Sequence, residues 1–329
     1  MDDNILEVKN LTTSFKVDEG KVKAVDKVSF DLKRGKVLGI VGESGCGKSI
    51  TAMSIMGLVG AKNGLIENGQ VLFEGKNLLD LNGLEINKVR GNEISMIFQE
   101  PMISLNPVLK IGDQIGEILK VHKNIIGAEN KKRVLEMLRL VGIKREEEIL
   151  NVYPHQLSGG MCQRVMIAMA LACTPKLLIA DEPTTALDVT VQSQVLELIN
   201  DIKDKFEMSV MFITHDLGVI CEVADEVMVM YAGSVVEKAP IEDIFDNPKH
   251  PYTIGLINSR PENFKKGEPL KCINGKVPKL SEISEGCLFS DRCDYVKDIC
   301  KINKPKLKAI SEGHDVRCFR YDWKEEGKI

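Results

Sequence analysis

The sequence predicts an α/β fold with a largely parallel sheet, a helical insert and a small cysteine-bearing unit at its C-terminal end. Over residues 5–95, short β-branched runs alternate with glycine turns, and a second strand-rich stretch begins at residue 177. Between them, residues 105–170 have apolar side chains at helical spacing. At about residues 260–285 the composition changes to Pro, Gly, Lys and Glu, which indicates a connector.

The individual elements follow from local patterns. The apolar run at residues 36–41 predicts a buried strand followed by a turn and a helix. The insert has Ile111, Ile115, Ile118 and Leu119 at spacings of three and four, which is typical of an amphipathic helix. Further strands are expected at residues 177–180, 210–214 and 227–230. We expect two domains, residues 1–245, with a helical subdomain at about 100–170, and residues 246–329.

The composition is that of an ordinary globular chain and argues against two classes of protein. Of 329 residues, 43% are hydrophobic and 28% charged, with a net charge of −4. Basic clusters are short, so a wide nucleic-acid surface is not expected. The longest apolar stretch, residues 165–173, is far shorter than the roughly 20 residues that span a bilayer. We therefore expect a cytoplasmic chain that needs another subunit to hold it at a membrane.

A phosphate-binding motif follows the first apolar run. The pattern G-x-x-x-x-G-K-S is formed by Gly42, Glu43, Ser44, Gly45, Cys46, Gly47, Lys48 and Ser49. Its backbone N–H groups can turn toward phosphate oxygens, and the helix that continues with Ile50 adds partial positive charge. Lys48 is expected to contact the outer phosphates and Ser49 to bind Mg²⁺. The motif alone leaves kinases, GTPases and other ATPases open.

Two carboxylates end the apolar run at residues 177–180. Asp181 is the expected Mg²⁺ ligand, because a buried strand can carry a charge at its tip when a cation pairs it. Glu182 can reach a water in line with the γ-phosphate and take its proton.

A second anion-binding helix start is predicted from the run Leu157-Ser158-Gly159-Gly160-Met161-Cys162-Gln163-Arg164. Because one chain needs only one cradle per nucleotide, this second one is best explained by a nucleotide on another subunit.

Together these motifs resemble the nucleotide-binding domain of the ATP-binding-cassette (ABC) family, a branch of the P-loop NTPases. The resemblance implies that Gln99 contacts Mg²⁺ and the attacking water. It also implies that the signature segment closes over the ATP of the opposite monomer through Ser158, Gly159, Gly160 and Gln163.

Three more positions match family elements in the expected order. The run Ala186-Leu187-Asp188 resembles the loop that links the two sites of a dimer, and His215 resembles the histidine that contacts the γ-phosphate. Phe15 lies where the family has an aromatic side chain on adenine. Two residues depart from the common pattern: Met161 replaces Gln, and Cys162 replaces the Arg of the peptide-importer branch, which could weaken contact with the partner's nucleotide.

The C-terminal end resembles the extension of oligopeptide and dipeptide importer ATPases, a branch that includes some nickel importers. The resemblance depends on Asn-Pro-Lys-His-Pro-Tyr-Thr at residues 247–253, Gly-Lys-Val-Pro at residues 275–278, and Cys287, Cys293, Cys300 and Cys318.

Four thiolates suit either Zn²⁺ or an iron–sulfur cluster. Their spacings are wider than zinc knuckles, and the family resemblance implies a structural [4Fe–4S] cluster; zinc or no metal remain alternatives. Cys272 lies outside the set, and Cys46, Cys173 and Cys221 are expected to be small buried hydrophobic residues.

The resemblance implies an ATP-hydrolysing subunit that powers import of di- or oligopeptides from the cytoplasmic face of the membrane. Its implied cofactors are ATP and Mg²⁺. Its implied partners are a second ABC subunit, identical or similar, and integral permease subunits, with a solute-binding protein acting indirectly. The alternatives are the ATPase of a nickel or other solute importer, and an ABC ATPase not coupled to transport.

Overall fold

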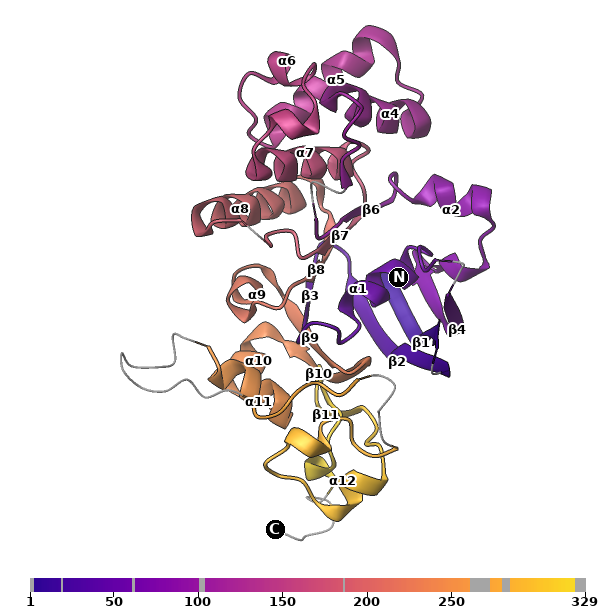
Figure 1. Ribbon diagram of the computed structural model, residues 1–329, viewed down its shortest axis with the longest axis vertical. Coiled ribbons are helices and arrows are strands. Elements are labelled where there is room, and N and C mark those ends of the chain that lie inside the picture. The colour runs from indigo at the N-terminus through magenta and orange to yellow at the C-terminus, as the bar shows by residue number, and fades with distance from the viewer. Residues whose placement is uncertain are drawn as a thin grey trace. The chain divides into compact units, whose positions relative to one another are not determined.

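The computed structural model describes residues 3–18, 20–60, 63–100, 104–185, 187–260, 273–279 and 285–322 (Figure 1). The chain forms two compact units whose segments alternate along the sequence. Unit 1 contains Met1–Leu6, Leu32–Val37 and Phe73–Ile213, and unit 2 contains Glu7–Asp31, Leu38–Leu72 and Thr214–Ile329.

Parallel strands form the sheet of unit 1, with β7 (Leu177–Asp181) between β6 (Ile94–Ile97) and β8 (Ser209–Ile213). Every residue of these strands is buried, which explains their nearly continuous apolar sequences. Ile97 lies opposite Ala180, so the segments that follow β6 and β7 begin at the same edge of the sheet. This edge positions the carboxylates described below.

The helices of unit 1 include a compact group in which α4, α5 and α7 pack on one another (Figure 1). α4 buries Ile111, Ile115 and Leu119 on one face and ends at Asn124, whose left-handed φ of 56° stops the helix. The bounds are α2 (Gly83–Val89), α4 (Ile111–Lys123), α5 (Gly127–Leu140), α6 (Glu146–Ile149), α7 (Gly159–Leu171) and α8 (Val189–Phe206).

Unit 2 contains most of a mixed sheet and most of a second sheet. In the first, β3 (Val37–Val41), which begins in unit 1, pairs in parallel with β9 (Glu226–Tyr231). β9 pairs antiparallel with β10, β10 with β12 and β12 with β11. The strands of the second sheet that lie mostly in unit 2 have the order β2-β1-β4. The remaining bounds are β1 (Asn4–Val17), β2 (Gly20–Lys33), β4 (Gly64–Phe73), β10 (Ser234–Pro240), β11 (Lys308–Ser311) and β12 (His314–Val316).

The helices of unit 2 are short, and most belong to its C-terminal part. α11 begins with Pro251, which suits the first helical position, and the ring of His250 accepts a hydrogen bond from the Tyr252 N–H at 3.1 Å. The bounds are α1 (Lys48–Ile55), α9 (Leu217–Val223), α10 (Ile241–Asp246), α11 (Pro251–Asn258) and α12 (Asp298–Ile302). Minor elements of both units are β5 (Lys76–Asn77), η1 (Leu78–Asp80), η2 (Pro154–Gln156), η4 (Ser290–Arg292) and η5 (Phe319–Tyr321).

The predicted α/β class with parallel strands and a helical insert is confirmed. The strand and the helix expected around residues 36–41 are confirmed as β3 and α1. Before them the chain forms two strands of 14 residues each, β1 and β2, where short runs separated by glycine turns were predicted. From Val28 to Leu32, β2 buries every second side chain, as expected for a strand with one face toward the core. The expected domain boundary at residue 245 falls within α10 and stays a prediction.

Candidate nucleotide site and cysteine cavity

The phosphate-binding motif forms a loop between β3 and α1. Gly47 has a left-handed φ of 101°, and a Cβ at this position would lie 2.5 Å from the carbonyl oxygen of Ala24. A Cβ on Gly42 would lie 2.3 Å from the carbonyl oxygen of Met230 in β9. Both positions therefore require glycine, because a side chain would displace neighbouring backbone.

Lys48 lies inside this loop rather than at its surface. Its ammonium group donates to the carbonyl oxygens of Gly42 at 2.7 Å and Glu43 at 3.2 Å, and the residue is only 5% exposed. The first amides of an α-helix have no acceptor within the helix, so the start of α1 attracts anions. Ser44 and Gly45 are exposed at the tip of the loop.

Cys46 is fully buried within the loop, as expected for a small hydrophobic residue. Burial raises the pKa of its thiol, so Cys46 stays protonated and unreactive.

The two carboxylates at the end of β7 lie in different environments. Asp181 is buried, 4% exposed, whereas Glu182 is partly exposed and has a left-handed φ of 47°. Its backbone N–H donates to the carbonyl oxygen of Ile213 at 2.8 Å, at the end of the neighbouring strand. A non-glycine residue with positive φ is uncommon and typical of functional sites, where strain is tolerated to direct a side chain.

The carboxylate of Glu182 is held by two donors. Gln99 follows β6 by two residues, and its Nε2 donates to Oε2 of Glu182 at 3.1 Å. Thr185 donates from its hydroxyl to the same oxygen at 2.9 Å. The structure thus brings together Gln99 and Glu182, two residues that the sequence predicted separately. Sequence reasoning did not identify Thr185, and its only signal is its position three residues after the carboxylate.

The predicted signature segment begins α7 as expected. Ser158 is the N-cap, with its hydroxyl accepting a bond from the Met161 N–H at 3.4 Å. Gly159 is exposed and Gly160 partly exposed. Gln163 is 2% exposed, and its Nε2 has no hydrogen-bond partner within the described part of the chain. Cys162 is buried and donates to the carbonyl oxygen of Pro154 at 3.5 Å, so this position faces inward.

The structure places three other predicted residues without testing their roles. Asp188 is the N-cap of α8 and accepts from the Val191 N–H at 3.0 Å. His215 is exposed between β8 and α9. Phe15 is partly exposed in β1, next to Gly64. Their contacts with nucleotide stay predictions.

The predicted site residues are divided between the two units. Unit 2 contains Phe15, His215 and the loop of residues 42–49 with Ile50, and unit 1 contains Gln99, Asp181, Glu182, Asp188 and residues 158–163. Within unit 1, the Gln99–Glu182 bond supports a common role for these two residues. Ala186 and Cys272 lie outside the described residues.

The cysteines of the C-terminal part surround a single small cavity of about 20 Å³. Its lining includes Cys287, Cys293, Cys300 and Cys318 together with the ring of Phe289. Burial raises the pKa of the Cys287 thiol to about 11 and that of Cys318 to about 12. Within the described residues, no three His, Cys, Asp or Glu side chains are arranged so that they could hold a metal ion.

The remaining cysteines follow the expectation with one exception. Cys173 is buried, but Cys221 is exposed. The prediction was wrong for Cys221 because α9 has one buried face, which contains Leu217, Val219, Ile220 and Val223, and Cys221 lies outside it.

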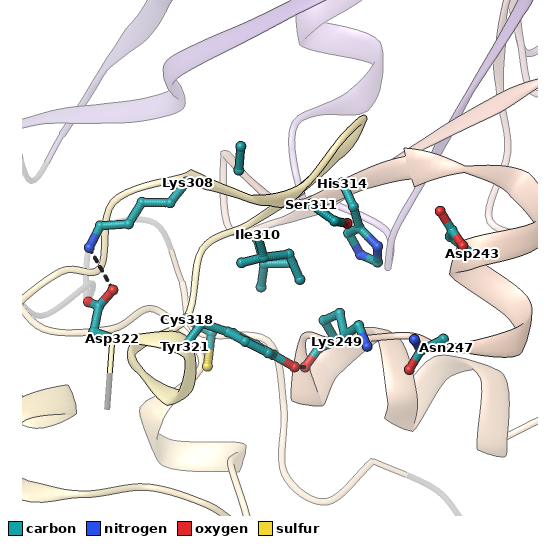
Figure 2. Close-up of a pocket in the computed structure, with 12 residues that line it drawn as sticks. Asp243, Asn247, Lys249, Lys308, Ile310, Ser311, His314, Cys318, Tyr321 and Asp322 are labelled. Carbon is teal, nitrogen blue, oxygen red and sulfur yellow. Dashed lines mark hydrogen bonds and ion pairs between the residues drawn. The ribbon is translucent and has the colours of Figure 1, made fainter. Parts of the chain in front are cut away.

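A larger pocket of about 490 Å³ lies next to the cysteine cavity in unit 2 (Figure 2). It is lined by residues of α10, β11 and β12, and by Lys249, Tyr321 and Asp322. Lys308 pairs with Asp322 at 2.6 Å at its border. Cys318 lines both this pocket and the cysteine cavity.

In the described part of the chain, no helix has both the length and the apolar character needed to cross a membrane.

The nucleotide loop, the carboxylates at the end of β7 and the Ser-Gly-Gly helix start define a class of protein, the ABC-type ATPases. The family model described as "ABC transporter" matches residues 25–185. A second model, described as "Oligopeptide/dipeptide transporter, C-terminal region", matches residues 236–300.

Curated relatives resemble the chain over nearly its full length. It is 52% identical to the oligopeptide transport ATP-binding protein AppD of Bacillus subtilis, over 98% of each chain. It is 49% identical to the dipeptide transport ATP-binding protein DppD of the same organism, over 99% of this chain and 98% of that one. The chain belongs to the family of ABC-transporter ATP-binding proteins, in its oligopeptide and dipeptide branch.

Solved structures agree with this fold. The ATP-binding cassette MJ0796, a dimer in a post-hydrolysis state bound to ADP and Pi, is 29% identical with a TM-score of 0.64. The match covers 72% of this chain and 98% of that one. The cbiO1 structure from Clostridium perfringens is 27% identical with a TM-score of 0.62, over 78% and 96% of the two chains. The chain is therefore an ABC-type ATPase.

Proposed function

We propose that this chain is the ATP-hydrolysing subunit that drives uptake of oligopeptides or dipeptides through a membrane permease. The observation that carries the ATPase part is the Glu182 carboxylate, held by Gln99 and Thr185 one residue after the buried Asp181. The peptide part depends on the relatives, which are named as oligopeptide and dipeptide transport proteins and match nearly the whole chain. Such a subunit works at the cytoplasmic face of the membrane, bound to its permease.

Each residue of the site has a chemical task in this proposal. Lys48 and the start of α1 bind the β- and γ-phosphates by charge and by backbone donors. Ser49 and Asp181 are assigned to Mg²⁺, which neutralises phosphate charge when bound. Glu182 accepts the proton of the attacking water, and Gln99 keeps the carboxylate directed while contacting the same water. His215 is assigned to the γ-phosphate and Phe15 to adenine.

The position of Phe15 in β1 supports its assignment to adenine. Thr13, two residues earlier in β1, exchanges a hydrogen bond of 2.8 Å with Ser54 of α1. Side chains two residues apart in a strand share a face, so Phe15 is on the face of β1 that contacts the helix following the phosphate loop.

In the working dimer, we assign the signature segment to the nucleotide that the second cassette binds. Ser158, Gly159 and Gly160 begin an exposed helix N-terminus that can bind the γ-phosphate on a partner subunit. We assign Gln163 and Asp188 to the same interface. ATP binding then favours the closed dimer and hydrolysis releases it, because a ligand shifts an equilibrium by its differential affinity for the two states.

The test of the ATPase assignment is Glu182→Gln. Turnover should fall by roughly 10²–10⁴-fold, the usual contribution of a general base, while ATP affinity stays unchanged. The measurement is phosphate release beside equilibrium binding of ATP. Glu197→Gln, an exposed change in α8, is the matched control. Near-normal turnover of the Glu182 variant would exclude Glu182 as the base.

We further propose that the cysteine cavity holds a [4Fe–4S] cluster. Four thiols line one cavity, and four thiolates are the ligand set of such a cluster. Zinc, which needs four sulfurs at about 2.3 Å from one point, is the alternative for these thiols. At about 20 Å³, the cavity has to widen for a cluster, by movement of the loops that carry the thiols.

Metal and sulfide analysis of anaerobically purified protein tests this assignment. We expect about four irons and four acid-labile sulfides per chain, with visible absorption that disappears in a Cys293→Ser variant. If the analysis finds zinc in place of iron, the cavity holds a structural zinc site and not a cluster. If it finds no metal, the cluster proposal is wrong. In either case the ATPase assignment is unaffected.

A nickel or other small-solute importer is the second candidate, and an ATPase without a permease the third. Co-purification from membranes separates the third from the other two, since integral permease subunits accompany a transport ATPase. Growth on peptides as the sole source of a required amino acid separates peptide uptake from uptake of other solutes.

A further inference from the structure

Glu43 occupies a position in the phosphate loop at which the motif accepts any residue. In this structure all three of its polar groups have partners. Its carbonyl oxygen accepts a bond from the Lys48 ammonium at 3.2 Å, and its backbone N–H donates to the hydroxyl of Tyr252 at 2.9 Å. Its carboxylate accepts two bonds from Arg292, Nη1 to Oε2 at 2.7 Å and Nη2 to Oε1 at 3.1 Å. Tyr252 and Arg292 both belong to the C-terminal part of the chain.

The Arg292 side chain is fixed in place. It is only 4% exposed, and its Nε donates to the carbonyl oxygen of Asn274 at 2.8 Å. Burial alone would lower the pKa of the guanidinium, but its bonds to Glu43 and Tyr231 outweigh burial and raise this pKa. A two-bonded arginine fork has one preferred geometry, so Arg292 fixes both the direction and the charge balance of the Glu43 carboxylate.

Three aromatic rings form the support for this pair. Tyr231 at the end of β9 packs against Tyr252 with ring centres 4.7 Å apart and against Phe289 at 5.3 Å. Tyr252 and Phe289 are 5.4 Å apart. Such ring pairs add stability beyond burial and hold their members at defined angles. The Tyr252 hydroxyl is therefore presented to the loop by a rigid cluster.

The same segment carries the cysteines. Arg292 directly precedes Cys293, and Phe289 lines the cysteine cavity. The Cys287 N–H donates to the carbonyl oxygen of Cys300 at 2.7 Å, which ties two cysteine segments together. The positions of Arg292 and Phe289 thus depend on the order of the cysteine-bearing segment.

Arg292 also neutralises the charge of the Glu43 carboxylate. A carboxylate in a loop that binds phosphates repels them unless a cation neutralises it. Lys48 is needed for the phosphates themselves, whereas the Arg292 guanidinium already bonds both oxygens of the Glu43 carboxylate.

We propose that Arg292 and Tyr252 are positioning residues of the nucleotide site, which hold and neutralise Glu43 so that the phosphate loop keeps its binding shape. The C-terminal extension is thereby coupled to nucleotide affinity, an inference that rests on the proposed ATP-binding function. Coupling between two sites is reciprocal, so bound nucleotide in turn stabilises the cysteine-bearing segment.

The first test uses Arg292→Gln and Glu43→Gln, singly and together, in the full-length chain purified without oxygen. The dissociation constant of a fluorescent ATP derivative with Mg²⁺ is measured for each. Arg292→Gln leaves an unpaired carboxylate in the loop, and the dissociation constant should rise about tenfold, within the usual range of coupling. Glu43→Gln in the same chain removes that charge and should restore most of the affinity. A merely structural role for Arg292 would not give this restoration.

Two matched controls separate the contact from general loosening of the extension. Arg317 also directly precedes a cysteine of the set, but donates to the carbonyl oxygens of Val235 at 2.7 Å and Pro305 at 3.2 Å. Arg317→Gln should therefore leave the dissociation constant of ATP unchanged. Tyr252→Phe should raise it roughly 2- to 10-fold, the value of one hydrogen bond. Tyr321→Phe, whose hydroxyl donates to the Lys249 carbonyl oxygen at 3.1 Å (Figure 2), should not raise it.

The inference is overturned if Arg292→Gln binds ATP as the parent does, if the double variant binds no better than Arg292→Gln, or if Arg317→Gln weakens binding equally. A parent chain that does not bind ATP would instead overturn the proposed function, so the two failures are distinguishable.

Discussion

At the scale of single residues, the proposed reaction makes Thr185 a positioning residue. Its hydroxyl donates to Oε2 of Glu182 at 2.9 Å, and Gln99 donates to the same oxygen at 3.1 Å. A general base must lie within hydrogen-bond distance of the proton it accepts, so the direction of the carboxylate matters as much as its basicity. Two donors on one oxygen restrict the rotation of Glu182.

Thr185→Val removes one of these donors with little change of shape. A hydrogen bond to a charged group contributes about 1.5–3 kcal/mol, so kcat should fall at least about tenfold while the KM for ATP changes little. Steady-state ATP hydrolysis measures both. Thr190→Val, at an exposed position in α8, is the control and should hydrolyse ATP normally. An unchanged kcat for the Thr185 variant would show that Gln99 alone directs the carboxylate.

Residues that begin or end a local element could be predicted from the sequence, and residues with distant partners could not. Lys48, Asp181 and Ser158 each stand next to a strand end or a helix start, where the neighbouring pattern indicates the geometry. Glu43 gave no such signal, because its partners are 209 and 249 residues away in the sequence. No periodicity connects positions so far apart, and only the folded chain reveals the contact.

At the scale of elements, hydrogen bonds to one buried carboxylate connect the C-terminal part to β10. Glu237 is fully buried and accepts hydrogen bonds from the Lys249 N–H at 2.7 Å and the His250 N–H at 2.8 Å. The Nε2 atom of His314, in β12, lies 2.8 Å from its Oε1. One side chain thus joins the strand β10, the start of α11 and the strand β12.

Glu237→Gln should destabilise the protein. Its NH₂ group would replace a carboxylate oxygen that accepts a hydrogen bond, so two donors would face each other. Leaving a buried donor unpaired costs about 1–3 kcal/mol, which urea unfolding followed by circular dichroism can measure. Glu242→Gln, exposed in α10, should change the free energy of unfolding by less than about 0.5 kcal/mol. Equal stability of the two variants would contradict the fastening role of Glu237.

The elements differ in how far the sequence revealed them. α4 was predicted because Ile111, Ile115 and Leu119 repeat with the period of a helix and are buried together. β11 and β12 contain four and three residues, too short for a periodic pattern. They form strands because β12 pairs with β10, with Val316 opposite Glu237, and this pairing joins segments far apart in sequence.

At the scale of the whole molecule, the proposed function gives the Ser158 helix start a task on a second subunit. Ser158 caps α7, and the exposed Gly159 follows it. An exposed helix N-terminus binds anions through free amides and its dipole. In the proposed dimer this anion is the γ-phosphate on the second cassette, so ATP itself joins the two subunits.

The dimer can be tested with a chain that binds ATP but does not turn it over. Glu182→Gln with Mg²⁺ and ATP should form a dimer, which light scattering with size-exclusion chromatography detects as a doubled mass. Adding Gly159→Asp should abolish the dimer, because a carboxylate at the helix start repels the partner's phosphates. A Cβ on Gly159 would meet nothing within 4 Å, and an acidic residue in the first turn favours the helix, so folding should be retained.

Dimers of both variants would contradict the role of the signature segment. Monomers of both would exclude pairing of identical copies and favour a partner with a similar but different chain, whose own signature segment would complete the site.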